Sequence, residues 1–404
     1  MSSSHEYQSS WPMVFLSYLS LIALYINIFS IPPITLALMR DMGLNHFQAG
    51  LLMTVYTISY CVNNIFAGLL SDRFGPKMIM ASGLFLAFWA SMLFTYTSNF
   101  QVMLFSRVLM GFSAASMTSP CLLYILSWLP LRWRGLGVSG HLASLTLGSG
   151  VVFLMTPIFL SLYPWRWLLR IYALQGFFAF VLFFLLGRES HEKRALFHPD
   201  YKELKAIVLS PFILLLSAIL FISLFQIGGT LTWLSPWLEE RCRLSPIQVG
   251  MGSMAFALAG IPSSILGGYL AAQSKSGQVQ RIVQLSMVGM LFSAGTGAFV
   301  WLEDRHYFSI ILVIILVSRW GSFMSMGPLL SLVPRLVSPD ARGLAMGMVN
   351  SIAISGGFFS SLLGGVLIKY TGQYQWFWML LSLSLLFSAL VLHPLFHKKI
   401  STLQ

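Results

Sequence analysis

The sequence predicts an all-α membrane protein with twelve transmembrane helices in two pseudo-symmetric six-helix bundles. Of its 404 residues, 57% are hydrophobic and only 9% are charged, which is more apolar surface than a water-soluble fold of this length covers. Twelve apolar runs are each long enough, at about 20 residues, to cross a bilayer as a helix. None alternates as the strands of a membrane barrel do, and the second six runs repeat features of the first.

The twelve runs follow one another with short breaks. The first begins at Trp11-Pro12, after an N-terminal stretch that lacks Lys and Arg. It is too long for the core of a signal peptide and has no small-x-small cleavage site, so we expect an uncleaved helix. The spans are expected at 12–38, 47–71, 78–97, 102–127, 136–160, 167–187, 209–237, 247–271, 282–302, 307–333, 344–368 and 374–396.

The basic residues between the spans predict the orientation. With the N-terminus inside, the cytoplasmic segments hold fifteen Lys and Arg and the outer loops hold seven, so we expect both termini in the cytoplasm. The absence of an N-x-S/T sequon favours the inner membrane of a bacterium. The net charge of +12 is dispersed over many short loops, which predicts contact with membrane lipid and argues against a nucleic-acid partner. We expect a monomer.

An internal repeat divides the chain. Residues 43–70 align with 243–270 at an offset of 200, with identities that include Gln48/Gln248 and Gly50/Gly250. Arg107 and Arg319 form a further matching pair, as do Arg134 and Arg342. We therefore expect an N-terminal bundle over 1–187, a cytoplasmic linker over 188–208 and a C-terminal bundle over 209–404. An even number of spans separates the copies, so both have the same orientation in the membrane.

The stretch GLLSDRFGPK at 68–77 lies between the second and third spans. It resembles the loop signature of the major facilitator superfamily, roughly G-x-x-x-D-[RK]-x-G-x-[RK]-[RK], although Met78 replaces the final basic residue. The twelve-span plan and Arg107-x-x-x-Gly111 in span four extend the resemblance over the whole chain.

This resemblance implies rocker-switch alternating access, with the loop acting as a cytoplasmic gate. Gly68 is expected to allow close helix approach and Gly75 a tight turn, while Asp72 accepts hydrogen bonds from a helix N-terminus or an arginine. The alternative is that the loop charges are only solvated and orient the chain. The second copy has Ala272 and Gln273 where Asp72 and Arg73 stand. The expected gating residues are Gly68, Asp72, Arg73, Gly75, Lys77 and Arg134.

The resemblance also implies that spans one, four, seven and ten line the central path. A cation inside a span costs about 2.5–3.5 kcal/mol on insertion scales, so two arginines at equivalent positions favour a substrate site over idle residues. The alternative is that each arginine caps backbone carbonyls or packs between helices. The expected substrate-binding residues are Arg107, Arg319, Asn27 and Gln226, with Tyr25, Tyr124 and Trp233 as cavity walls.

The charges inside the spans predict the cargo. No Asp or Glu falls within the expected span boundaries, so the arginines favour an organic anion or a carboxylate-bearing metabolite. His141 is a candidate for proton coupling because imidazole titrates near neutral pH; a packed structural histidine is the alternative. Cys61, Cys121 and Cys242 have neither disulfide nor metal spacing, and we expect no metal and no cofactor.

These observations predict a secondary active transporter for a small-molecule substrate, driven by protons or by a counter-transported solute. A proton-coupled exporter of drugs or metabolites is one alternative, although span five lacks the Gly-Pro pair typical of the family's drug antiporters. A transporter-like ligand receptor is another. No catalytic motif or ATP-binding loop is present in the sequence, so we do not expect an enzyme.

Overall fold

The computed structural model describes residues 3–130, 133–189, 210–272, 278–302, 307–330, 332–333 and 342–395. Regular structure throughout these residues is helical. Their contacts define two compact units, which consist of Met1–Leu44 with Val55–Leu196 and of Asn45–Thr54 with Phe197–Gln404. Only Arg188 and Glu189 of the expected linker lie within the described residues, so the role of 188–208 stays a prediction.

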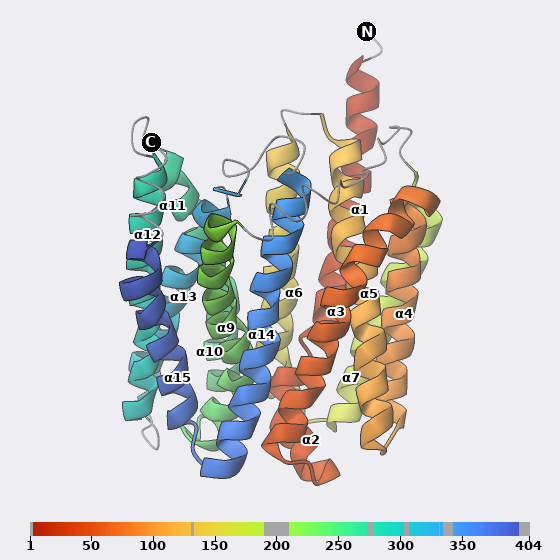
Figure 1. Cartoon of the computed structure of the whole chain (residues 1–404). Coiled ribbons are helices and arrows are strands. Elements are labelled where there is room, and N and C mark those ends of the chain that lie inside the picture. The colour runs from red at the N-terminus through yellow and green to blue at the C-terminus, as the bar shows by residue number, and fades with distance from the viewer. Residues whose placement is uncertain are drawn as a thin grey trace. The chain divides into compact units, whose positions relative to one another are not determined.

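The first unit is a bundle of long helices around one apolar core (Figure 1). Helix α1 packs on α5, α6 and α7, and α4 packs on α5 and α7. Met80, Met117 and Tyr124 are among the fully buried residues of the core. The helices are α1 (Ser3–Ile28), α2 (Ile31–Met42), α3 (His46–Phe74), α4 (Pro76–Tyr96), α5 (Phe100–Trp128), α6 (Arg134–Leu160) and α7 (Trp165–Leu186).

The second unit has its own apolar core between α9, α12, α13, α14 and α15. Helices α9 and α14 run side by side along their length (Figure 1). The elements are α9 (Pro211–Glu240), α10 (Pro246–Leu258), α11 (Gly260–Ala272), α12 (Gln278–Ser293), the 3-10 helix η2 (Ala294–Leu302), α13 (Phe308–Leu330), α14 (Arg342–Thr371), α15 (Gln375–Phe387) and the π-helical turn η5 (Ser388–Leu392).

The two units use the same helix pairings, as the sequence repeat predicts. The first and fifth spans pair as α1 with α6, and the seventh and eleventh pair as α9 with α14. The third and fourth spans pair as α4 with α5, and the ninth and tenth pair as α12 with α13. The pseudo-symmetry is therefore present in the packing as well as in the sequence.

Prolines interrupt two of the expected spans. Pro32 and Pro33 occupy the first turn of α2, and because proline has no N–H to donate, the helix breaks between α1 and α2 at residues 29–30. The expected span 247–271 is likewise divided into α10 and α11, with Pro262 in the first turn of α11. Each break leaves two segments that together cover the length of one span.

The helix surfaces fit a lipid environment. Eleven helical segments within the described residues are long and apolar enough to cross a membrane, and α3, with 29 residues, covers the expected second span. Large apolar side chains such as Phe105, Phe178 and Leu185 are more than half exposed, which is costly in water but favourable in a bilayer. Several helices extend a few residues beyond the predicted spans. Helix α9 continues past residue 237 and includes Glu239 and Glu240, α2 includes Asp41 and α3 includes Asp72.

Candidate functional site

Both predicted arginines are buried and lie over aromatic rings at repeat-related positions. Arg107 of α5 is 2% exposed, and its Cζ atom is 4.9 Å from the ring centroid of Tyr56 on α3. Arg319 of α13 is 3% exposed, and its Cζ atom is 4.4 Å from the ring of Phe256 on α10. Tyr56 and Phe256 are themselves equivalent in the repeat, so the same arginine–aromatic pair is built twice.

Arg319 differs from Arg107 in having a second ring beside it. Its Cζ atom is 4.0 Å from the ring of Phe323, one turn further along α13, where Gly111 occupies the equivalent position in the first unit. The Nε and Nη1 atoms of Arg319 are buried and have no hydrogen-bond partner among the described residues. The guanidinium therefore keeps its stacking contacts while two of its donor atoms are free to bind an anion.

Asn27 holds three helices of the first unit together. Its Nδ2 atom donates to the carbonyl oxygen of Tyr172 on α7 at 3.0 Å and to that of Ala23 at 3.0 Å. The hydroxyl of Ser91 on α4 donates to its Oδ1 atom at 2.9 Å. These bonds use the amide of Asn27 for helix packing, and its role toward substrate stays a prediction.

Gln226 has a related position in the second unit. The hydroxyl of Ser322 on α13 donates to its Oε1 atom at 2.8 Å, and its Nε2 atom donates to Thr230 at 3.3 Å. Ser322 also lies 2.9 Å from the hydroxyl of Ser293 on α12. Gln226 thus belongs to a buried polar chain that begins one turn from Arg319.

The three predicted wall aromatics lie in different surroundings. Tyr25 is buried in α1 and stacks on Phe29. The hydroxyl of Tyr124 donates to the carbonyl oxygen of Arg188 at 2.8 Å, beyond the end of α7. Trp233 is buried on α9, and its Nε1 atom donates to the carbonyl oxygen of Ser361 on α14 at 3.1 Å. Tyr25 and Tyr124 both belong to the apolar core of the first unit, and the role of the three aromatics as cavity walls stays a prediction.

The turn of the predicted gate contains Gly75 at a φ of 81°, as expected for a glycine-dependent tight turn. The carboxylate of Glu189 lies where a side chain on Gly75 would be, 2.9 Å from an ideal Cβ. A Cβ at Gly68 would meet no described atom within 4 Å, and the close helix approach expected at Gly68 stays a prediction.

The charged gate residues are only partly described. Arg73 lies over the ring of Phe74 at 5.2 Å, and Lys77 is 5.9 Å from the ring of Phe184. The side chains of Asp72 and Arg134 lie outside the described part of the structure. The proton-coupling candidate, His141, is on α6, and its Nδ1 atom is buried without a hydrogen-bond partner among the described residues. The gating and coupling roles remain predictions.

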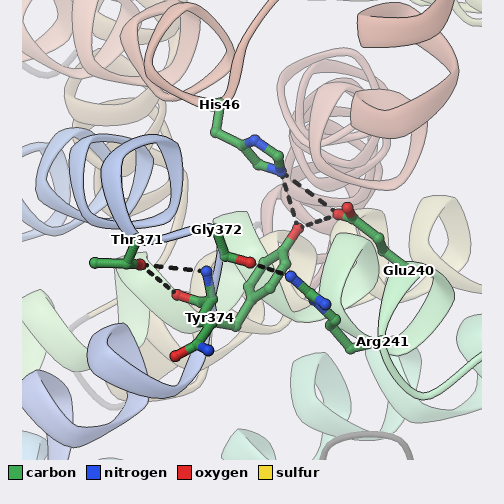
Figure 2. A network of polar contacts seen from close by, with 7 residues as sticks. His46, Glu240, Arg241, Thr371, Gly372 and Tyr374 are labelled. Atoms are coloured by element: carbon green, nitrogen blue, oxygen red, sulfur yellow. Dashed lines mark hydrogen bonds and ion pairs between the residues drawn. The ribbon is translucent and has the colours of Figure 1, made fainter.

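A polar cluster that the sequence did not reveal lies within the second unit (Figure 2). The Nε2 atom of His46, at the start of α3, is 3.5 Å from Oε2 of Glu240 at the end of α9. The hydroxyl of Tyr374 donates to the same oxygen at 2.8 Å and is 3.4 Å from Nε2 of His46.

One sequence signal distinguishes His46. The repeat has Pro246 at the equivalent position, so the histidine is a departure from the common pattern of the two halves. In the sequence, Glu240 is only an acidic residue shortly after the expected span 209–237. Their association depends on segments almost two hundred residues apart, which no local pattern relates.

Comparison with known proteins identifies a family and two kinds of sequence relative. Residues 14–361 match the family model described as Major Facilitator Superfamily. Quinolone resistance protein NorA of Staphylococcus aureus is 31% identical over 101 residues, which are 25% of this chain and 26% of that protein. An uncharacterized transporter of Buchnera aphidicola subsp. Schizaphis graminum is 25% identical over 293 residues, which cover 69% of this chain and 66% of the relative. The chain thus spans about a quarter of the length of the NorA proteins that it matches.

Solved structures share the fold at low sequence identity. A bacterial homolog of the human lysosomal transporter Spinster, in an inward-facing and unoccupied conformation, has a TM-score of 0.79 and 14% identity, covering 96% of this chain and 97% of its own. The inward-facing and occupied form has a TM-score of 0.78 and 16% identity, with coverage of 98% and 97%.

Proposed function

The chain belongs to the major facilitator superfamily, and from this premise we propose that it is a secondary active transporter for a small organic anion or a carboxylate-bearing metabolite. It works by alternating access in the inner membrane of a bacterium, with both termini in the cytoplasm. Its substrate is a small molecule, and protons or a second solute drive the cycle. No enzymatic activity is proposed.

The observation that carries the anionic cargo is the state of Arg319. Its guanidinium is buried between two phenylalanine rings, and Nε and Nη1 have no partner among the described residues. A buried donor without an acceptor costs free energy that an incoming anion recovers. The free Nε–H and Nη1–H groups point to different edges of the planar guanidinium, and each can donate one charge-assisted hydrogen bond to an anionic oxygen.

The NorA relative suggests a practical probe. Its name associates it with quinolones, and a fluoroquinolone such as norfloxacin carries a carboxylate that can be blocked as an ester. We expect purified protein to bind norfloxacin more tightly than its ethyl ester. Hydrogen bonds to charged groups contribute about 1.5–3 kcal/mol, so Arg319→Gln should weaken norfloxacin binding by about 10- to 150-fold. Arg319→Lys should bind norfloxacin little better than Arg319→Gln does, because lysine keeps the charge but lacks the planar guanidinium.

Arg170→Gln is a matched control. Arg170 also stacks on an aromatic ring, that of Tyr96 at 4.3 Å, but it lies on α7 near the end of α4, away from the repeat-related arginines. Its replacement should leave norfloxacin binding within about twofold of the parent. Equal affinity for norfloxacin and its ester, together with unchanged binding in Arg319→Gln, would contradict the anionic cargo.

A proton-coupled exporter of drugs or metabolites is the second candidate function, favoured by the partial match to NorA. The direction of norfloxacin movement in proteoliposomes with an imposed pH gradient separates the two. Norfloxacin movement opposite to that of protons indicates proton antiport, the coupling of an exporter. Movement in the same direction as protons indicates symport, the coupling of an importer.

A further inference from the structure

The start of α3 is attached to the second unit, although the rest of α3 belongs to the first. An ideal Cβ on Gly50 would be 2.6 Å from the carbonyl oxygen of Ser361 on α14, and one on Gly365 would be 2.5 Å from that of His46. The hydroxyl of Thr54 donates to the carbonyl oxygen of Phe358 at 3.2 Å. Backbones touch here without intervening side chains, so the start of α3 packs closely on α14.

The cluster of His46, Glu240 and Tyr374 closes this contact at one end (Figure 2). Its members come from the start of α3, the end of α9 and the turn between α14 and α15. The orientation predicted from the basic residues places all three segments on the outer face of the membrane. The His46 ring also packs against Trp233, with centroids 5.9 Å apart, and its side chain is 21% exposed. A proton can therefore reach an imidazole that is otherwise enclosed.

Charged and titratable groups surround His46 on several elements. From α9, Glu240 contributes the nearest carboxylate, with Glu239 beside it, and Arg241 donates to the carbonyl oxygen of Gly372. From α14, Lys369 lies 5.6 Å from the ring of Phe47. The hydroxyl of Tyr374 lies 3.4 Å from Nε2 of His46.

We propose that His46, Glu240 and Tyr374 form a proton-binding latch, in which protonation of His46 holds the start of α3 against α9 and the turn between α14 and α15. The cationic imidazole forms a charge-assisted bond with Glu240, while Tyr374 donates to the same carboxylate and keeps it in place. Loss of the proton leaves a neutral ring beside the carboxylate, and the contact weakens.

The direction of the effect follows from the sign of the charges. Histidine is the side chain that gains its charge between pH 8 and pH 5, and the gained charge is opposite to that of Glu240. Acidification of the outer side therefore closes the latch, and a rise in pH opens it. The latch itself does not depend on the proposed transport function. Only its place in the transport cycle does, where an external proton drives closure of the outer end.

The test is a distance measurement that needs no cargo. Spin labels are attached at Leu44→Cys and Gln373→Cys in a Cys61→Ser background, since Cys121 and Cys242 are buried. In lipid nanodiscs, pulsed electron resonance at pH 5.5 should give one short distance, and at pH 8 a second, longer population. For one proton, the ratio of the two populations changes by up to about tenfold per pH unit.

Variants of the cluster identify the titrating group. His46→Gln should abolish the pH dependence, and Glu240→Gln, which removes the partner charge, should reduce it severalfold. Glu239→Gln makes the same charge change one residue away and should retain it. The proposal is overturned if the parent distances do not change with pH, or if their dependence persists in His46→Gln. Failure of norfloxacin binding would not affect this readout, so the two hypotheses fail independently.

Discussion

Arg107 and Arg319 occupy equivalent positions in the two halves, but their surroundings differ. Each is buried in the fourth helix of its half and lies over a ring of the second helix, which replaces part of the lost hydration of the guanidinium. Phe323 then adds a ring beside Arg319, where the first half has Gly111. The larger residue encloses Arg319 and leaves its free donors in an apolar setting, where an anion binds most strongly.

The glycines of the gate loop offer a prediction at the same scale. Gly75 combines a φ of 81° and a ψ of 146°, a region that side chains other than glycine rarely occupy, so Gly75→Ala should destabilise the protein by about 1–3 kcal/mol. Gly68→Ala is the matched control, because its Cβ meets nothing within 4 Å and alanine stabilises a helix by about 0.5–1 kcal/mol. Thermal unfolding in detergent measures both. A lower unfolding midpoint for Gly68→Ala than for Gly75→Ala would contradict the interpretation that the backbone conformation at residue 75 requires glycine.

At the scale of elements, the repeat extends to the way in which helices begin. Helix α3 starts after Asn45, whose Oδ1 atom accepts from the amide of Gln48 while the Gln48 side chain accepts from the amide of Asn45. Helix α10 starts in the same way with Ser245 and Gln248. These reciprocal bonds satisfy otherwise free donors at the helix start. The glutamine that recurs in the repeat therefore has a structural role in both copies, and the residue after the cap is His46 in the first copy and Pro246 in the second.

The contact between α3 and α14 gives a prediction at this scale. Gly365→Ala places a methyl group against the carbonyl oxygen of His46, and such overpacking costs about 1–3 kcal/mol. The spin-label pair at 44 and 373 should then show the longer distance even at pH 5.5. Gly357→Ala on the same helix meets its nearest atom at 3.8 Å and should behave as the parent does. A short distance in Gly365→Ala would show that this close approach does not hold the latch.

At the scale of the molecule, the two repeat copies share their helix packing but carry different charged residues. The pairings of α1 with α6 and of α9 with α14 are equivalent, yet the predicted gate charges occur in the first copy and the histidine cluster attaches to the second unit. A transporter that rocks between two states needs contacts that form in only one of them. The differences between the copies are where such contacts are expected.

Asp72 supplies the prediction at this scale. If its carboxylate acts as the cytoplasmic latch, Asp72→Asn should lower norfloxacin transport in proteoliposomes at least about tenfold, the effect of a bias near 1.4 kcal/mol between the states. Norfloxacin binding and expression should change little, because the residue biases the states without touching cargo. Norfloxacin flux in Asp72→Asn equal to that of the parent would show that Asp72 does not act in the gate.

The sequence by itself determined the membrane class, the helix positions and the repeat, because burial in lipid requires long apolar helices and leaves a signal in every span. It also singled out Arg107 and Arg319, since a charge inside a span is rare and conspicuous. The tertiary structure alone decided which donors of Arg319 have no partner among the described residues, which amide groups hold helices together, and that His46 contacts Glu240 and Tyr374. These depend on side chains from distant segments meeting at a few ångströms, and the apolar pattern of each helix carries no information about that distance.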